Sequence, residues 1–221
     1  ILNKTAPLAA VTIYHVGSLA RRQIDQWSHV MMTPLYPAIT GMHALGAQER
    51  VRNVYTRGGR IALWVLLLPV LPAIIYAGMV IRLYIGDQYA DAGVVMALTL
   101  ACLPITAGGY MVWPLAVAAG RVRLAGSTSL ASQLAVIAAA LYMVVGLQWG
   151  AIGVALAAFV IPTISSVAVT WPLGQRLADV RFGTFVRRTL LPGLTPGCVA
   201  SVVWVLLDIV VRPARWTSLG L

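Results

Sequence analysis

The sequence predicts an all-α integral membrane protein, and three observations support this fold class. First, 60% of the 221 residues are hydrophobic and only 10% are charged, with a mean hydropathy of +0.86. Soluble domains carry about 25% charged residues, so this chain lacks the charge needed to cover a water-facing surface. Second, the apolar residues gather in long uncharged runs, and third, basic residues concentrate in every second connection between the runs. Disorder is excluded as well, because disordered chains have low hydrophobicity.

Five apolar runs are long enough to cross a membrane as helices. A helix needs about 20 apolar residues to span a hydrocarbon core of roughly 30 Å. The runs are too long for membrane strands and lack an alternation of period two. We predict spans over residues 61–81, 92–118, 127–147, 151–172 and 189–211. Only the last contains a charge, Asp208, near its end.

The connections between the runs alternate in charge. The basic connections are 46–60 with four Arg, 120–126 with two and 174–188 with four, which together hold ten of the 16 Lys and Arg residues. The segments between them, 82–91 and 148–150, have no excess of positive charge. Because basic loops remain in the cytoplasm, the three basic segments are assigned to that side. The alternation also requires a sixth span over 14–43, which hydropathy alone would miss.

Local signals mark the turns and bends of these helices. Gly86-Asp87 predicts a helix stop followed by an N-cap, Gly120–Arg123 a tight basic turn and Gly150–Gly153 a turn of small residues. Prolines are frequent in the predicted spans, where each removes a hydrogen bond and can bend the helix. Transmembrane helices tolerate proline in general, but as a group these prolines fit a transporter whose helices bend between states.

The predicted helix over 14–43 has one polar face. Residues at sevenfold spacing share this face, and polar residues three or four positions away join it. They are His15, Ser18, Arg22, Asp25, His29, Thr33, Tyr36, Thr40 and His43. Asp25 can pair with either Arg21 or Arg22. An Arg facing lipid at mid-membrane costs from about 3 to more than 10 kcal/mol, so the polar face should meet water or protein.

Three interpretations of this polar face remain open. It can line a water-filled cavity whose Arg residues meet an anionic substrate, it can hold a buried Arg–Asp pair that stabilises helix packing, or the helix can lie in the membrane interface. The candidate cavity residues are Arg21, Arg22, Asp25 and His29. His29 lies near the helix centre and could titrate, but histidines 14 residues apart are about 21 Å apart and cannot share one ion. We expect no catalytic, cofactor-binding or metal-binding residues.

Several short segments match the motifs of one family in order along the chain. They are Ile13-Tyr14, Pro37 with Ala44–Arg50, Leu68-Pro69, Leu83–Ala92, Ala119–Arg123 and Gly150–Ala155. The last three are similar to the family's W-L-G-x-x-F/Y-x-x-A, A-x-G-R/K-x-R and G-x-x-G-x-A turns, whereas Thr12 replaces the glycine of a G-x-Y entry. The chain thereby resembles the polysaccharide-exporter branch of the multidrug/oligosaccharidyl-lipid/polysaccharide superfamily, the O-antigen-type flippases.

This resemblance implies that the chain, residues 1–221, is the C-terminal six-helix lobe of a two-lobe flippase. The N-terminal lobe would be a missing part of the same protein. The implied substrate is a lipid-linked oligosaccharide, an undecaprenyl-pyrophosphate glycan, which alternating access moves from the cytoplasmic to the periplasmic leaflet of the inner membrane. Family cavities are commonly cationic, so Arg21 or Arg22 is expected to contact the pyrophosphate and Asp25 to neutralise that Arg between visits. Membrane lipids are the other expected partners, and nucleic acid is not one.

Three alternatives belong to other functional classes. A cation-coupled multidrug antiporter of the same superfamily would need acidic cavity residues, and only Asp25 is available. A membrane enzyme of polyprenyl-glycan assembly would need an extramembrane active site, but the longest hydrophilic stretches, 44–60 and 173–188, are short and contain one acid each. A structural scaffold gives no reason for charged residues inside a span. We therefore expect a transporter and no enzyme.

Overall fold

The computed structural model describes residues 8–211, with side chains for 10–28, 30, 31 and 33–206. This part of the chain is almost entirely helical and contains no strand. The α-helices are α2 (Leu8–Gly17), α3 (Leu19–Met32), α4 (Leu35–Ala44), α5 (Gln48–Ile75), α6 (Ala77–Ile85), α7 (Ala90–Ala101), α8 (Leu103–Ala107), α9 (Val112–Ala118), α10 (Val122–Leu141), α11 (Gly150–Ser165), α12 (Trp171–Ala178), α13 (Phe182–Phe185) and α14 (Leu191–Val211). One 3-10 segment, η1 (Asp87–Tyr89), and three π-helical segments, η2 (Tyr142–Gly146), η3 (Ser166–Thr170) and η4 (Val186–Leu190), complete them.

Five helical stretches are long and apolar enough to cross a membrane. They are Gln48–Ile75, Asp87–Ala107, Val122–Gly146, Gly150–Ala178 and Phe182–Leu206. Only 11% of the most apolar window of Val122–Gly146 is buried, and side chains such as Leu130 and Leu134 point outward with 61% and 58% of their surface exposed. An apolar outer surface of this extent would not be stable in water. The described chain is therefore all-helical, as predicted, and has the helices expected of a multi-pass membrane protein.

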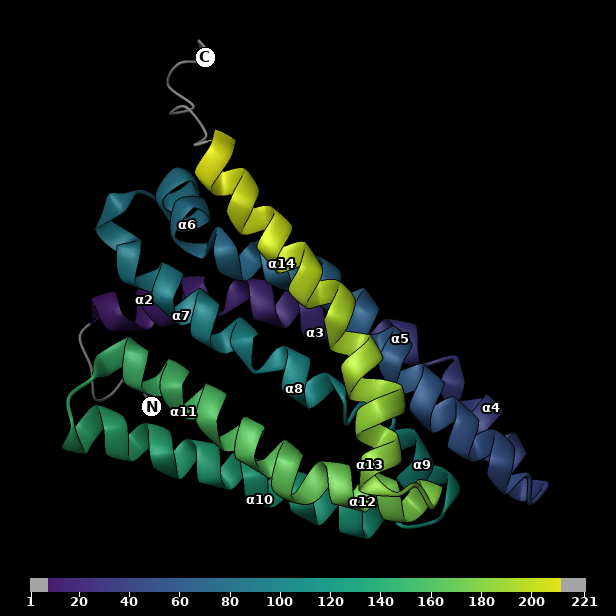
Figure 1. Ribbon diagram of the computed structural model, residues 1–221. Helices are drawn as coiled ribbons and strands as arrows, with labels where there is room; N and C mark the ends of the chain where they lie inside the picture. The colour runs from purple at the N-terminus through teal and green to yellow at the C-terminus, as the bar shows by residue number, and fades with distance from the viewer. Residues whose placement is uncertain (1–7, 212–221) are drawn as a thin grey trace.

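The predicted single helix over 14–43 is instead three consecutive helices, α2, α3 and α4, which follow one another along the bundle (Figure 1). The first break is at Ser18, whose hydroxyl donates to the His15 carbonyl at 3.1 Å and competes with the regular helix bond. The second is at Thr33-Pro34, where proline lacks the N–H that the helix needs. None of the three pieces is long enough to be counted among the five membrane-length stretches.

The segments predicted as basic loops are largely helical. α5 begins at Gln48, and only Asp179 to Arg181 separate α12 from α13. The α4–α5, α9–α10 and α12–α13 turns nevertheless lie at one end of the bundle, at the lower right of Figure 1, whereas the α6–α7 and α10–α11 turns lie at the other. We call the first the basic end.

Glycine permits several of these sharp reversals. Gly46, Gly86 and Gly120 have φ values of +65°, +105° and +66°, which side chains other than glycine rarely adopt. Gly86 stops α6 as predicted. Asp87 does not cap the next helix through its side chain, because its carboxylate instead lies 3.9 Å from Arg82.

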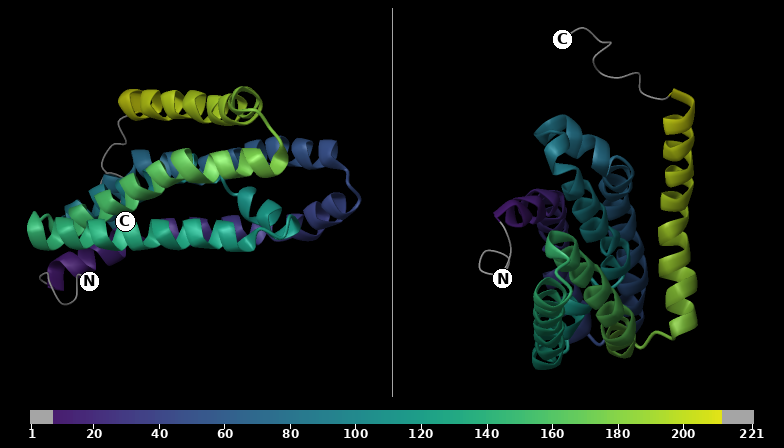
Figure 2. Two further views of the ribbon diagram at one scale, coloured as in Figure 1. Left: turned by 90° about the horizontal axis from the view of Figure 1, so that it is seen from below. Right: turned by 90° about the vertical axis from the view of Figure 1, so that its left-hand side faces the viewer.

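The helices pack around α7, which contacts α2, α3, α5, α6 and α11. The main apolar core includes Leu63, Leu66 and Leu100 between α5 and α7. A second core at the basic end contains Tyr55 and Trp171, whose rings pack against Phe185 at centroid distances of 5.6 and 5.7 Å. α14 packs mainly against α5 and stands at the side of the bundle (Figure 2). This arrangement leaves α3, α9, α10 and α11 around a shared space.

Candidate functional site

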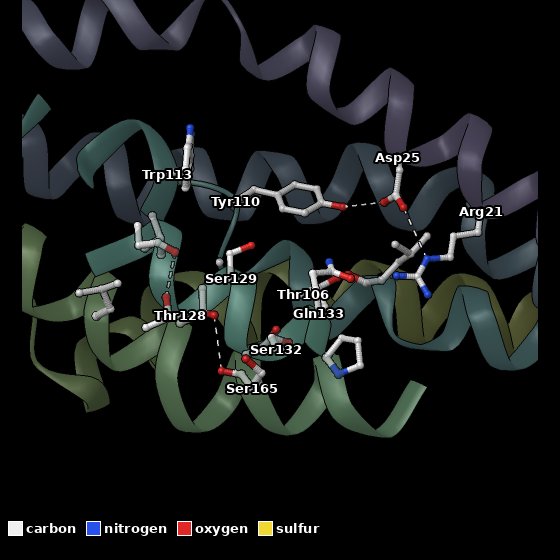
Figure 3. A pocket seen from close by; sticks show the side chains of 18 residues that line it. Arg21, Asp25, Thr106, Tyr110, Trp113, Thr128, Ser129, Ser132, Gln133 and Ser165 are labelled. Carbon is white, nitrogen blue, oxygen red and sulfur yellow. Dashed lines mark hydrogen bonds and ion pairs between the residues drawn. The ribbon is translucent and has the colours of Figure 1, made fainter. Parts of the chain in front are cut away.

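A pocket of about 370 Å³ lies among these helices, which is within the usual range for ligand sites of about 300–1,000 Å³. Apolar side chains form part of its lining, and the polar side chains come from α3, α8, the α8–α9 connection, α10, α11 and η3. They are Arg21, Asp25, Thr106, Tyr110, Thr128, Ser129, Ser132, Gln133, Ser165, Ser166 and Thr170. Figure 3 shows Arg21 and Asp25 on one side of the pocket and Ser132 and Ser165 on the opposite side.

The charged side of the pocket is an internally neutralised pair. Arg21 Nε lies 3.5 Å from Asp25 Oδ2, one helical turn away, and Arg21 Nη1 donates to the Ala158 carbonyl at 3.3 Å. Tyr110 Oη donates to the other carboxylate oxygen, Asp25 Oδ1, at 3.3 Å. The two charged side chains are 24% and 35% exposed. The pair is therefore held by neighbouring groups, yet a ligand in the pocket can reach it.

The opposite side of the pocket offers hydroxyl groups. Thr106 and Thr128 donate to backbone carbonyls of their own helices, Leu103 and Ala125, at 3.2 and 2.9 Å. A hydroxyl used as a donor in this way retains lone pairs that accept from a ligand. Ser129 and Ser132 make no hydrogen bond to another described residue, so their hydroxyls are free to donate or accept.

This chemistry suits a neutral, hydroxyl-rich ligand. Several hydroxyls and the Gln133 amide supply both donors and acceptors, as the hydroxyl groups of a sugar require. Tyr110 and Trp113 add aromatic surface from the α8–α9 region. Because Asp25 already compensates Arg21, the lining has no net charge, and a phosphate would have to displace the carboxylate in order to bind Arg21.

Arg22 does not line this pocket. Its Nη2 lies 3.2 Å from His15 Nδ1, from the His15 carbonyl and from Ser18 Oγ. The predicted sevenfold spacing is thus confirmed for His15 and Arg22, which share a face across the break at Ser18. One residue along a helix rotates the side chain by about 100°, which separates Arg22 from Arg21 and Asp25. His29 lies in α3, but its side chain is outside the described residues.

The structure also bears on the three interpretations of the polar face. The Arg21–Asp25 pair exists and lines a pocket, so the cavity and the stabilising ion pair are the same feature. α3 packs against α5 and α7, both of which belong to membrane-length stretches, and this argues against a helix lying apart in the interface.

The hydroxyl side of the pocket was not predicted from the sequence. The signal was present as the run Ser127 to Gln133 inside the predicted span 127–147, which contains three serines, one threonine and one glutamine. Hydropathy averaged over a span hides such a run, because one side of a helix can be polar while the mean remains apolar.

Comparison of the chain with known protein families, with curated proteins and with solved structures finds no match. The resemblance to polysaccharide exporters therefore stays a prediction. The pocket and the distribution of charge are the observations from which a function is inferred.

Proposed function

We propose that the protein is a flippase that moves a lipid-linked oligosaccharide, an undecaprenyl-pyrophosphate glycan, from the cytoplasmic to the periplasmic leaflet of the inner membrane. The observation that carries this proposal is a polar, hydroxyl-lined pocket inside a bundle whose outer faces are apolar. A glycan head group cannot cross hydrocarbon unaided, and such a pocket replaces the hydrogen bonds that it loses to water. The lipid tail would remain in the bilayer.

In this proposal the chain is the C-terminal six-helix lobe, with α2–α4 as its first crossing, and an N-terminal lobe supplies the facing wall. Rocking of the two lobes then exposes the pocket to each side in turn, as in other alternating-access transporters. The hydroxyls of α10 and of the α11–η3 region bind sugar. Arg21 meets the pyrophosphate when it exchanges Asp25 for the phosphate oxygens, and Asp25 neutralises the guanidinium between transport cycles.

That exchange is energetically accessible. The Arg21–Asp25 contact is long at 3.5 Å and partly exposed, and ion pairs of this kind contribute about 0–1 kcal/mol. A bidentate bond between Arg and phosphate is stronger and shorter than this pair. The ligand therefore competes with a weak intramolecular partner.

The test compares Arg21→Gln with Arg22→Gln in the intact protein. Loss of a charged hydrogen bond to the ligand costs about 1.5–3 kcal/mol, so Arg21→Gln should slow flipping by roughly 10- to 100-fold. Arg22→Gln removes the same charge from the neighbouring position outside the pocket and should stay near the parent rate. The measurement is movement of a fluorescent lipid-pyrophosphate glycan across proteoliposomes, at equal amounts of folded protein. Equal rates for the two variants would exclude the role of Arg21, and a large loss only in Arg22→Gln would reverse the assignment.

A second candidate, a cation-coupled multidrug antiporter, is favoured by one observation, the partly exposed Asp25 carboxylate in the pocket. Asp25→Asn separates the two functions. An antiporter would lose cation-coupled drug efflux, whereas a flippase would retain most of its glycan movement because Arg21 remains. Drug efflux and glycan flipping are measured on the same preparation, with Arg22→Gln as the control.

A further inference from the structure

A second polar region lies at the basic end, away from the pocket that contains Arg21. Two adjoining pockets of about 440 and 530 Å³ share Arg181, Thr184 and Arg188 in their linings. The first pocket is also lined by Arg52, Asp179 and Val180, and the second by Gly183 and Arg187. These residues come from the start of α5, the α12–α13 turn, α13 and the π-helical segment η4.

The charges of this region are not balanced. Asp179 Oδ2 lies 2.6 Å from Arg52 Nη2, so its single negative charge is already neutralised. No carboxylate of the described residues lies within ion-pair distance of Arg181, Arg187 or Arg188. Three guanidinium groups therefore surround one region without compensation, in contrast to the neutralised Arg21 pocket.

Local structure fixes the backbone that carries these arginines. Asp179 adopts a left-handed conformation, with φ and ψ both 50°, which ends α12 and turns the chain. Aspartate tolerates this conformation better than most residues do. Phe185 is completely buried and packs against Tyr55 and Trp171, so it anchors the helix that carries the arginines.

The cluster lies where a membrane-length helical stretch begins. Arg181 immediately precedes the stretch Phe182–Leu206, and Arg187 and Arg188 lie within its first two turns. Long basic side chains near the end of a membrane helix extend to the head-group level, where lipid phosphates lie. The three side chains are exposed, so soluble anions can reach them as well.

We propose that Arg181, Thr184, Arg187 and Arg188 form a binding site for a phosphate group. The guanidinium groups bind the phosphate oxygens through paired N–H donors, and the Thr184 hydroxyl supplies a further donor. The phosphate comes either from an anionic lipid head group or from a free phosphate in solution. This site is independent of the transport activity proposed above, because it shares no residue with the Arg21 pocket.

The experiment uses the intact protein reconstituted in nanodiscs of phosphatidylcholine. The probes are short-chain fluorescent phosphatidylglycerol and inorganic phosphate. The test variant is Arg181→Gln/Arg187→Gln/Arg188→Gln, and the matched variant is Arg57→Gln/Arg121→Gln/Arg123→Gln, which removes three exposed arginines from the same end outside these pockets. The test variant removes the paired donors to the phosphate and should weaken binding by roughly 100-fold, whereas the matched variant removes only more distant charge and should weaken binding much less.

The two probes distinguish a lipid head group from a free phosphate as the ligand. Binding of phosphatidylglycerol that inorganic phosphate does not displace, and that the test variant loses, identifies a lipid site. Saturable binding of inorganic phosphate that the test variant loses identifies a soluble ligand. Equal losses in the two triple variants, or no saturable binding of either probe, would overturn the proposal, because the arginines would then act only through net charge.

A conservative variant serves as a control for loss of binding through misfolding. Arg181→Lys/Arg188→Lys retains the charge but removes the paired donors of guanidinium. Weaker binding in this variant supports a built phosphate site, whereas unchanged affinity overturns it. Transport activity, measured alongside, should remain near the parent value in every folded variant of this cluster.

Discussion

The guanidinium of Arg21 contacts groups on two helices. It lies near Asp25 in its own helix and donates to the carbonyl of Ala158 in α11. The bond to Ala158 links α3 to α11 at the edge of the pocket, so the position of Arg21 depends on how these two helices pack. A movement of α11 relative to α3 would change the reach of Arg21 into the pocket without any change in sequence.

The pocket hydroxyls give a prediction at the residue scale. Ser132→Ala should weaken ligand binding by about 0.5–1.5 kcal/mol, or roughly 2- to 13-fold, because one neutral hydrogen bond is lost. The matched control is Ser127→Ala on the same helix, since Ser127 donates to the Leu124 carbonyl and does not line the pocket. Binding of a lipid-linked glycan to the intact protein is measured for both. Equal affinity of the two variants for the lipid-linked glycan would show that Ser132 does not bind it.

Two of the long helices contain a π-helical segment just before a proline. The π-helical segments η3 and η4 end at Thr170 and Leu190, and each is followed two residues later by a proline, Pro172 and Pro192. Proline has no N–H to donate and its ring crowds the carbonyl four residues earlier, so the preceding turn widens. A local change of helix type therefore accompanies these two prolines near the basic end.

Close packing of α14 on α5 gives a prediction at the element scale. A β-carbon added to Gly193 would lie 2.6 Å from Cδ1 of Leu63, which is fully buried. Gly193→Ala should therefore destabilise the protein by about 1–3 kcal/mol through overpacking. Gly126→Ala on α10, where nothing lies within 4 Å, is the control and should be neutral or stabilising by about 0.5–1 kcal/mol. Thermal unfolding in detergent measures both, and an unchanged transition for Gly193→Ala would contradict this packing.

The tertiary structure gathers the basic turns at one end of the molecule (Figure 1). The long helices are apolar on the outside, where side chains such as Leu130 and Leu134 are exposed. α9 packs against both α4 and α12, and this contact brings the three basic connections together. Positive charge on one side of a membrane fixes the orientation of a helical protein. The same end contains the phosphate site proposed above.

Orientation can be tested by cysteine labelling. In a variant whose two native cysteines are replaced by alanine, single cysteines are introduced at Ala47, Arg121 and Arg181, and separately at Gln88 and Leu147. A membrane-impermeant maleimide should label the first three from the cytoplasmic side and the last two from the opposite side. Labelling of both groups from the same side would show that the long helices do not cross the membrane with the predicted alternation.

The sequence alone predicts the helical class, the approximate positions of the five long apolar stretches and the alternation of charge between them. These properties follow from composition and from the length that a hydrocarbon core requires, both of which are local along the chain. It also determined that Asp25 can reach Arg21, since residues four apart on a helix are neighbours.

Tertiary packing determines which of two adjacent arginines lines a pocket and which distant residues complete it. Arg21 and Arg22 are equivalent in a hydropathy plot, but α11 lies beside Arg21, whereas Arg22 turns back to His15. The gathering of the α10 hydroxyls at the pocket depended on packing in the same way. Charge and hydrophobicity predict which segments are helices. The contacts between helices join residues that are far apart in the chain, so no single segment encodes them. These contacts determine which pocket or neighbour each side chain meets.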